Sequence, residues 1–191
     1  MVRWEPNTRE RLVLAAVDLF AEQGYDATTV TEIAERAGGL TKMTFFRHFA
    51  DKREVLFAGQ EIHRRLLADG IAAAPEAATP LEATGAGLDA LTSSFTDERR
   101  EFSARLLAVM ASSSELQERA TFKRAALAGA MEDALRQRGV PDPAAGLAAE
   151  LGVGAFYRAF DRWADPASQR TLTDLTREAF AELRAALVTL G

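Results

Sequence analysis

The sequence predicts an all-α protein, with a three-helix unit containing a helix-turn-helix in residues 1–53 and a larger helical domain in residues 54–191. Apolar residues recur at helical spacing, and Val, Ile and Thr form no alternating, strand-like runs. Ala, Leu, Glu and Arg, which favour helices, are abundant. Prolines, which cannot continue a helix, fall in or beside the gaps between the expected helices: Pro75, Pro80, Pro141, Pro143 and Pro166.

Capping motifs mark three helix starts near the N-terminus. Asn7, Thr29 and Asp51 each stand three positions before a glutamate, so the side-chain oxygen can accept a free backbone N–H and the glutamate can reach back. Gly24 ends the first helix, and the pair Gly38-Gly39 breaks the second. The expected helices of this unit are 8–23, 30–37 and 42–49, with a fourth that begins after Asp51 and continues to about residue 67 or 68.

The remainder of the chain predicts a second group of helices. A stretch rich in Ala, Pro and Thr, residues 72–80, is expected to be a loop. The fourth helix would connect the helix-turn-helix to this group. Further helices are expected near residues 81–95, 97–112, 115–138, 143–164 and 172–190.

Charge is unevenly distributed along the chain. The net charge of −5 argues against a nucleic-acid partner for the chain as a whole. A basic patch between residues 36 and 53, with Asp51 as its only acidic residue, can nevertheless bind phosphates locally. A chance fluctuation of surface charge would give the same pattern. The basic residues are Arg36, Lys42, Arg47, Lys52 and Arg53.

Composition also bears on the compartment. No segment approaches the roughly 18 uninterrupted apolar residues of a membrane span, and the N-terminus lacks the apolar stretch of a secretion signal. The absence of cysteine excludes disulfides and thiolate metal sites. We therefore expect a cytoplasmic protein with no membrane partner.

Residues 29–48 have the pattern of a helix-turn-helix, in which two short helices flank a glycine turn and a preceding helix packs across both. The second short helix of such a unit presents its first residues to base edges, while helix N-termini aim N–H groups at phosphates. A packing element with a solvated basic face would have the same pattern. The side chains expected on the exposed face are Thr41, Lys42, Met43, Thr44, Arg47 and His48.

Three runs carry a resemblance to a known family: LFAEQGY at residues 19–25, TTVTEIA at 28–34 and TFFRHFADK at 44–52. With them, residues 8–57 resemble the DNA-binding domain of the tetracycline-repressor (TetR) family of transcriptional regulators. The resemblance implies a homodimer whose N-terminal domains bind a palindromic operator of double-stranded DNA. It also implies a C-terminal domain that binds a small effector, with repression as the usual outcome.

The resemblance implies roles for individual residues. Lys42 and Met43 match base-facing positions, where lysine can donate to guanine and methionine can rest against a thymine methyl. Lys52 matches a lysine at the start of the fourth helix, where the helix dipole assists phosphate binding. The backbone-phosphate contacts implied are Thr29, Thr44, His48 and Lys52.

Two departures from the family pattern affect the predicted interface. Phe46 stands where the family usually has tyrosine, so this DNA-facing position lacks one hydroxyl. The turn reads Ala-Gly-Gly-Leu-Thr-Lys at residues 37–42, one residue longer than the usual Ala-Gly-Val-Ser-Lys. We expect the glycines to absorb the extra residue, with Leu40 in the buried turn position. The base-reading residues are affected more than the phosphate contacts.

The larger domain carries apolar residues that would line an effector cavity, although ordinary core packing also explains them. Arg105, beside one apolar face, is a candidate anchor for an anionic effector. Residues 45–54 and 156–163 resemble a branch of the family with an acyl-CoA-like effector domain, which suggests a lipophilic or acyl-type effector. The predicted ligand-binding residues are Phe102, Arg105, Leu106, Met110, Phe122, Phe156 and Phe160.

The last two helices are the expected dimer interface. Small residues between Gly146 and Ala155 permit close helix approach, and apolar residues recur at helical spacing from Leu172 to Leu187. In the resembled family, these helices pair with their symmetry mates in a four-helix interface. The alternative is packing against the middle helices of the same chain.

The sequence predicts no enzyme activity, metal or cofactor. His48 and His63 lie in expected helices without a carboxylate and nucleophile arrangement, and there is no Gly-rich phosphate loop or paired-histidine metal motif. The main hypothesis is a repressor that an effector releases from its operator. The alternatives are a helical small-molecule carrier or sensor with impaired DNA binding, and an architectural DNA-binding protein without an effector.

Overall fold

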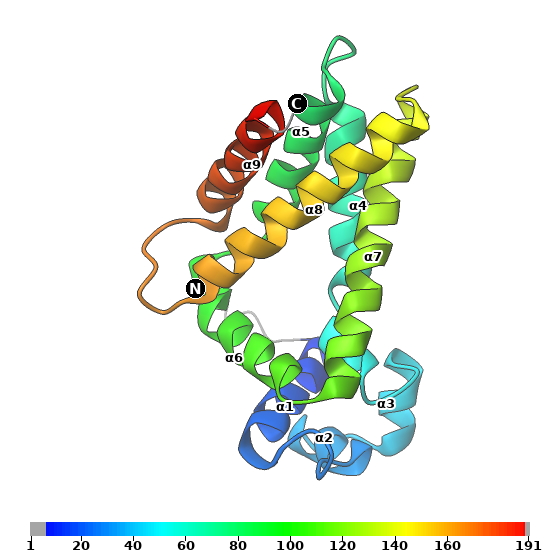
Figure 1. Ribbon diagram of the computed structural model, residues 1–191. Coiled ribbons are helices and arrows are strands. Elements are labelled where there is room, and N and C mark those ends of the chain that lie inside the picture. Colours follow the sequence, from blue (N-terminus) through cyan, green and yellow to red (C-terminus); the bar gives the residue numbers. More distant parts are fainter. Residues whose placement is uncertain (1–6, 190–191) are drawn as a thin grey trace, which may run out of the picture. The chain divides into compact units, whose positions relative to one another are not determined.

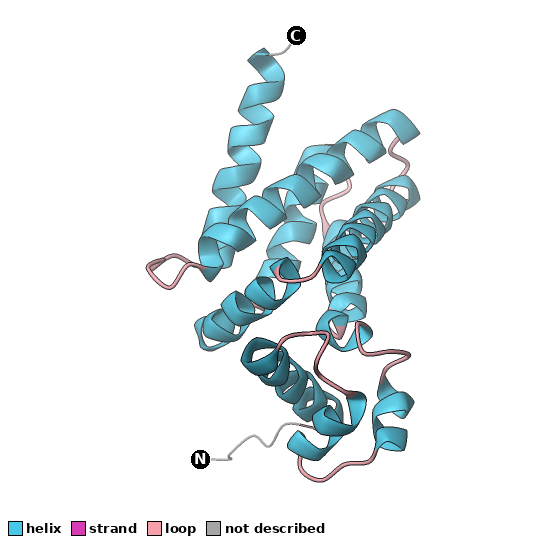
Figure 2. Cartoon of the chain, turned by 60° about the horizontal axis from the view of Figure 1, so that its bottom comes forward, coloured by secondary structure: helices cyan, strands magenta, loops and turns pink. Residues whose placement is uncertain are grey.

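The computed structural model describes residues 7–189, and every regular element in that range is helical (Figures 1 and 2). This confirms the predicted all-α class for the described residues. No helix among them combines the length and apolar character needed to cross a membrane. The elements are α1 (Thr8–Gln23), α2 (Val30–Arg36), α3 (Lys42–His48), the 3₁₀ turn η1 (Glu54–Phe57), α4 (Gln60–Ala73), α5 (Pro80–Thr92), the 3₁₀ turn η2 (Asp97–Arg99), α6 (Arg100–Ala111), α7 (Ser114–Gln137), α8 (Asp142–Ala164) and α9 (Leu172–Thr189).

The helices divide between two compact units. The first unit consists of the described residues up to Gly59 together with Arg105–Ala120. The second consists of Gln60–Ala104 and the described residues from Thr121 onward. Helices α6 and α7 therefore supply residues to both units. Separate functions for residues 1–53 and 54–191 stay a prediction.

The first three predicted helices are confirmed, and their capping residues act as expected. The Asn7 side chain accepts the Glu10 N–H at 3.0 Å at the start of α1. Thr29 and Glu32 form both halves of a capping box at α2. Local sequence is therefore sufficient to set where these helices begin.

The prediction of one continuous helix beginning after Asp51 and ending at about residue 67 or 68 is wrong. Asp51 Oδ1 accepts the Glu54 N–H at 3.0 Å, but this cap starts only the single turn η1. Three consecutive apolar residues of η1, Val55–Phe57, are all buried, which one face of a surface α-helix would not allow. Helix α4 begins after Gly59 and continues through Ala73, so the predicted loop at residues 72–80 is also shorter.

The first unit is built on α1, which packs against α2 and η1, while α2 packs against α3. Leu12 and Phe20 of α1 are buried, and the Phe20 ring meets Tyr25 edge-on at 5.2 Å. On α3, Phe45 is fully buried and Phe49 follows one turn later at the helix end. Because these phenylalanines fix one face of α3 inward, the opposite face must point outward.

In the second unit, α5 packs against α4, α8 and α9, and α8 packs along α9 (Figure 1). Asp89 on α5 accepts two hydrogen bonds from Arg177 on α9, at 2.9 and 3.0 Å. Arg100 donates to the carbonyl oxygens of Trp163 and Ser168, both at 2.9 Å, and so holds the end of α8. The last residue of the final predicted helix, Leu190, lies outside the described residues.

Candidate functional site

Helix α3 has one buried and one exposed face. Its cap residue, Thr41, accepts the Thr44 N–H at 3.1 Å, and the two hydroxyls lie 3.0 Å apart. On the outer face, Met43 is 76% exposed and Phe46 is 48% exposed, which is unusual for large apolar side chains. Thr41, Lys42, Met43, Arg47 and His48 of the predicted face are exposed, and Thr44 is half-buried.

The five cations of the basic patch differ in their partners. Arg36 donates two hydrogen bonds to Glu22, at 3.0 and 2.9 Å. Arg53 pairs with Asp51 at 2.8 Å and with Glu115 at 3.2 Å. Lys42 and Arg47, on α3, form no ion pair with any residue in the range 7–189. The charge available to an outside anion is therefore concentrated on α3.

Lys52 is held by the protein itself. Its Nζ donates to the carbonyl oxygens of Tyr25, at 2.6 Å, and Thr28, at 3.0 Å, and lies 4.0 Å from the centre of the Tyr25 ring. The predicted position of Lys52 in the first turn of the fourth helix is wrong, because Lys52 precedes η1 and α4 begins at Gln60. Its contact with phosphate stays a prediction.

Thr29 is also engaged within its own helix start. Its hydroxyl donates to Glu32 Oε2 at 2.7 Å, and its N–H donates to the same oxygen at 2.7 Å. Hydrogen bonds from the Thr29 side chain and backbone, and from Gln23, hold the pKa of Glu32 below its usual value. Thr29 is exposed, so a phosphate could reach it. To donate to that phosphate, however, the Thr29 hydroxyl would first have to break its hydrogen bond to the Glu32 carboxylate.

The lengthened turn between α2 and α3 uses both glycines in the left-handed region. Gly38 has φ 106° and Gly39 has φ 70°. The turn closes with a 2.9 Å hydrogen bond from the Leu40 N–H to the Ala34 carbonyl, and α3 then begins at the predicted residue, Lys42. Leu40 is half-buried rather than buried. The expectation that the glycines absorb the extra residue is thus met.

Sequence reasoning missed the side chain that supports this turn. Arg11 of α1 donates from Nε to the Ala37 carbonyl at 2.7 Å and from Nη2 to the Gly38 carbonyl at 3.5 Å. No local pattern could have identified Arg11, because its partners lie 26 and 27 residues further along the chain.

Ion pairs fasten the segment Arg105–Ala120 within the first unit. Arg105 donates to Asp18 of α1 at 2.7 Å. Arg119 donates from both Nε and Nη2 to Glu54 Oε1, the former at 2.7 Å. Arg105, predicted as an anchor for an anionic effector, thus already has a carboxylate partner.

An aromatic cluster occupies the second unit. The Phe95 ring lies 6.0 Å from Phe156, 5.6 Å from Phe160 and 5.9 Å from Trp163. His63 lies 5.0 Å from Phe95, and burial, with a smaller effect from the charge of Arg99, lowers the pKa of His63 to about 4. This histidine is therefore neutral at physiological pH.

The seven predicted ligand-binding residues have different surroundings. Phe156 and Phe160 are buried and in ring contact, 5.7 Å apart. Phe102 is half-buried in the same unit, whereas Phe122 is 61% exposed. The other three, Arg105, Leu106 and Met110, belong to the first unit. A ligand site formed by these residues stays a prediction.

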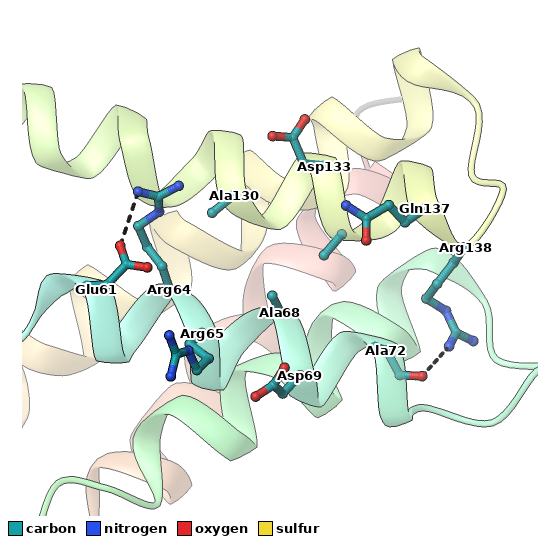
Figure 3. Close-up of a pocket in the computed structure, with 11 residues that line it drawn as sticks. Glu61, Arg64, Arg65, Ala68, Asp69, Ala72, Ala130, Asp133, Gln137 and Arg138 are labelled. Carbon is teal, nitrogen blue, oxygen red and sulfur yellow. Dashed lines mark hydrogen bonds and ion pairs between the residues drawn. The ribbon is translucent and has the colours of Figure 1, made fainter.

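A surface hollow of about 630 Å³ lies between α4 and α7 in the second unit (Figure 3). Charged side chains line both sides, among them Arg64, Arg65 and Asp69 on α4 and Asp133 on α7. Arg138 closes one end by donating to carbonyl oxygens at the end of α4 and just beyond it. None of the predicted ligand-binding residues lines this hollow.

The helices α8 and α9 bury part of their apolar surface inside the chain. A side chain at Gly152 would lie 2.7 Å from Met131 Sδ, so this part of the small-residue stretch packs against α7. Leu172 and Leu175 of α9 are buried. Leu147 of α8 and Val188 of α9 remain exposed. Intramolecular packing therefore accounts for some of the predicted interface, and exposed apolar positions remain on both helices.

In the part of the chain that the structure describes, no group of three or more His, Asp or Glu side chains could hold a metal ion.

Comparisons with known proteins relate the first unit to bacterial regulators. The family model for bacterial regulatory proteins, tetR family, matches residues 12–58. The chain is 53% identical over 49 residues to the HTH-type transcriptional regulator TcmR of Streptomyces glaucescens, covering 26% of this chain and 21% of TcmR. It is 36% identical over 63 residues to the HTH-type transcriptional activator FasR of Mycolicibacterium smegmatis, covering 33% of this chain and 28% of FasR.

Similarity to a solved structure extends over most of the chain. SmeT, the repressor of the Stenotrophomonas maltophilia multidrug efflux pump SmeDEF, has a TM-score of 0.55 to this chain at 23% identity. The match covers 93% of this chain and 89% of SmeT. Sequence similarity to the two curated relatives, by contrast, spans less than a third of either relative.

Proposed function

We propose that the chain is a regulator of the tetR type, because the model of that family matches residues 12–58, and that it binds a palindromic operator as a homodimer and regulates transcription. In this proposal a small-molecule effector alters operator binding. Repression, with release by the effector, is the expected direction. The relatives include both an activator, FasR, and a repressor, SmeT, so the direction is a separate question for experiment.

The exposed face of α3 is the observation that carries the proposal. Lys42 and Arg47 have no ion-pair partner among residues 7–189, and exposed Met43 and Phe46 lie on the same short helix. Cations can bind phosphates or guanine edges, and apolar groups can rest against thymine methyls. A helix face that only contacts solvent has no reason to expose two large apolar side chains to water.

The division of roles follows from what each side chain already contacts. Lys42 and Met43 would contact bases, while Arg47, His48 and Thr44 would contact the backbone, with Thr41 and Phe46 flanking them. Thr29 and Lys52 hold internal hydrogen bonds, so they would contribute through exchange of those bonds or through backbone N–H groups at the helix start.

A homodimer is the arrangement that suits a single recognition helix per chain. Two-fold symmetry would present two copies of α3 to successive major-groove faces, about one helical turn apart. Leu147 and Val188, exposed on α8 and α9, support an interface on these helices. The buried positions of the same helices belong to the interior of each subunit.

The route from effector to DNA would run through helices that belong to both units. Lys52 precedes α4 in the chain, so a movement of α4 would not move Lys52 directly. Helices α6 and α7 cross from one unit to the other, and ion pairs of Arg105 and Arg119 fasten their junction to Asp18 and Glu54. An effector in the second unit that moved these helices would shift the population of DNA-binding states.

The predicted chemistry of the effector rests on the aromatic cluster. Phe95, Phe156 and Phe160 form an apolar cluster, and an effector that packed against these rings would be a lipophilic or acyl-type molecule. The charged hollow between α4 and α7 does not suit such a molecule. A cytoplasmic location, where operator DNA is found, belongs to the same proposal.

One alternative has specific support. The internal hydrogen bonds of Thr29 and Lys52, and the missing hydroxyl at Phe46, would weaken phosphate binding and favour a small-molecule carrier or sensor with impaired DNA binding.

Selection of duplexes from a random library with the purified full chain tests the proposal. Enrichment of an inverted repeat, bound in a strongly salt-dependent manner, is the expected result. Failure to enrich any sequence would favour the carrier or sensor. The selected duplex is then titrated in the presence of a panel that includes acyl-CoA thioesters and free fatty acids. Binding that no compound alters would favour an architectural protein.

A further inference from the structure

The turn between α2 and α3 has an unusual hydrogen-bond pattern. In the common glycine-terminated helix end, the second residue after the cap donates to the third carbonyl from the end. Here Ala37 is the cap, and Leu40, one residue further, makes that bond to Ala34 at 2.9 Å. Both Gly38 and Gly39 donate to the Glu35 carbonyl, at 3.1 and 2.8 Å. The turn is therefore wider by one residue and contains two glycines in the left-handed region.

Two adjacent left-handed glycines give a turn little intrinsic stiffness, because glycine loses the most conformational freedom on folding. The carbonyls at the end of α2 also lack helical partners and carry negative partial charge. A cation that binds these carbonyls would stabilise the turn. The guanidinium of Arg11 does so, donating to Ala37 at 2.7 Å and toward Gly38 at 3.5 Å.

The fit between Arg11 and the first glycine is close. A Cβ atom placed on Gly38 would lie 1.9 Å from Arg11 Nη2 and 3.0 Å from its Cζ. Any side chain at Gly38 would therefore displace the guanidinium, in addition to straining a φ of 106°. Gly39, by contrast, has open space at this position. Gly38 and Arg11 thus act as a matched pair.

We infer that Arg11 is a positioning residue for the recognition helix, holding the two-glycine turn so that Lys42 and Met43 meet defined base pairs. The inference rests on the proposed function. Only three residues separate Gly38 from the start of α3, so a change of turn conformation would rotate or shift the first turn of that helix. Base readout depends on that first turn, whereas phosphate contacts tolerate small displacements of long side chains.

The test compares two substitutions that remove the same charge from the same part of the surface. Arg11→Met removes the guanidinium that binds the turn carbonyls. Arg36→Met removes a neighbouring cation that pairs with Glu22 and contacts no turn carbonyl. Each full-length variant is titrated with the duplex selected by the wild type and with duplexes carrying one substituted base pair. For Arg11→Met, discrimination between these duplexes should fall by about tenfold, the scale of one lost hydrogen bond. Arg36→Met should retain the wild-type discrimination.

A loss of affinity that is the same for every duplex, and equal in the two variants, would overturn the inference. Arg11→Lys, which keeps the charge but not the guanidinium geometry, should fall between the wild type and Arg11→Met. Thermal melting of each variant identifies those that do not fold, and Arg11→Lys then replaces Arg11→Met in the comparison.

Amide hydrogen exchange separates this inference from the proposed function. In the free protein, exchange of the Leu40 N–H should be faster in Arg11→Met than in Arg36→Met, because the Leu40 bond closes the turn. Equal exchange rates would contradict the inferred role of Arg11 in holding the turn, even if the wild type selects an inverted repeat. Faster exchange in Arg11→Met, together with a wild type that selects no duplex, would support the stabilisation of the turn by Arg11 and contradict the proposed function.

Discussion

Helix α3 and the segment from Asp51 to Glu54 are both rich in charge, but the structure uses them differently. On α3, Lys42 and Arg47 are exposed and form no ion pair with any residue in the range 7–189. In the following segment, the Lys52 ammonium binds two carbonyls and the Arg53 guanidinium binds two carboxylates. A count of basic residues therefore overstates the surface available to phosphate, because some cations hold the unit together.

The difference arises from the distance to each partner along the chain. The burial of Phe45 and Phe49 one turn apart decides which face of α3 is exposed, and that spacing is local. The partners of Lys52 are Tyr25 and Thr28, 27 and 24 residues earlier. Such contacts exist only once the helices have packed.

The largest expected effect concerns Lys52 as a structural residue. Lys52→Met would leave the Tyr25 and Thr28 carbonyls without this donor, and the free energy of unfolding should fall by about 3 kcal/mol. Chemical denaturation measures the change. Arg47→Met, which removes an exposed cation, is the matched control and should change stability by less than about 0.5 kcal/mol. Equal stability of the two variants would mean that Lys52 is as free as the α3 cations.

A titratable group in the second unit extends the same contrast between buried and exposed charge. The pKa of His63 is about 4 in the folded protein, below the value of about 6.5 expected when unfolded, so the unfolded chain binds more protons between these values. Protonation of His63 should not lower the free energy of unfolding well above pH 6.5, and should lower it by about 2 kcal/mol at about pH 5.

The His63→Phe variant separates this effect from the titration of carboxylates. Its stability should lose the part of the pH dependence that lies between about pH 6.5 and 4. Urea unfolding of both proteins across that range provides the measurement. Parallel curves for the variant and the wild type would show that His63 is not buried as a neutral group.

The smallest expected effect sharpens the role of the exposed face. Met43→Ala should reduce the preference for one base pair of the selected duplex by about 1 kcal/mol, with little change in affinity for unrelated duplexes. Competition between single-substituted duplexes measures the preference. A uniform loss across all of them would place Met43 away from the base edges.

Sequence alone predicted the parts of the fold that depend on local signals. Capping at Asn7 and Thr29 located α1 and α2, and the predicted exposed face of α3 agrees with the structure except at Thr44, which is half-buried. The capping motif at Asp51 misled, because a cap does not decide whether a 3₁₀ turn or an α-helix follows. Three buried residues in succession after the cap made the difference.

The rest of the candidate site depended on long-range packing. Arg11 meets its turn 26 residues away, and Arg105 meets Asp18 at a separation of 87 residues. The predicted ligand-binding residues were chosen as apolar positions on helix faces, a pattern shared by core and cavity. Only the packed structure distinguishes a buried cluster, such as Phe156 with Phe160, from an exposed side chain such as Phe122.

The salt dependence of DNA binding tests the central claim most directly. Lys42→Gln with Arg47→Gln is compared with Arg36→Gln plus Arg53→Gln, which removes the same charge from cations that already have carboxylate partners. On a random-sequence duplex, binding is through phosphates alone and Lys42 has no specific base to contact, so both cations count as phosphate contacts. The slope of log affinity against log salt should then become shallower by about 1.8 for the α3 pair, about 0.9 for each lost phosphate contact. The control pair should change the slope by less than half as much. Equal changes in the two double variants would contradict the claim that α3 carries the available charge.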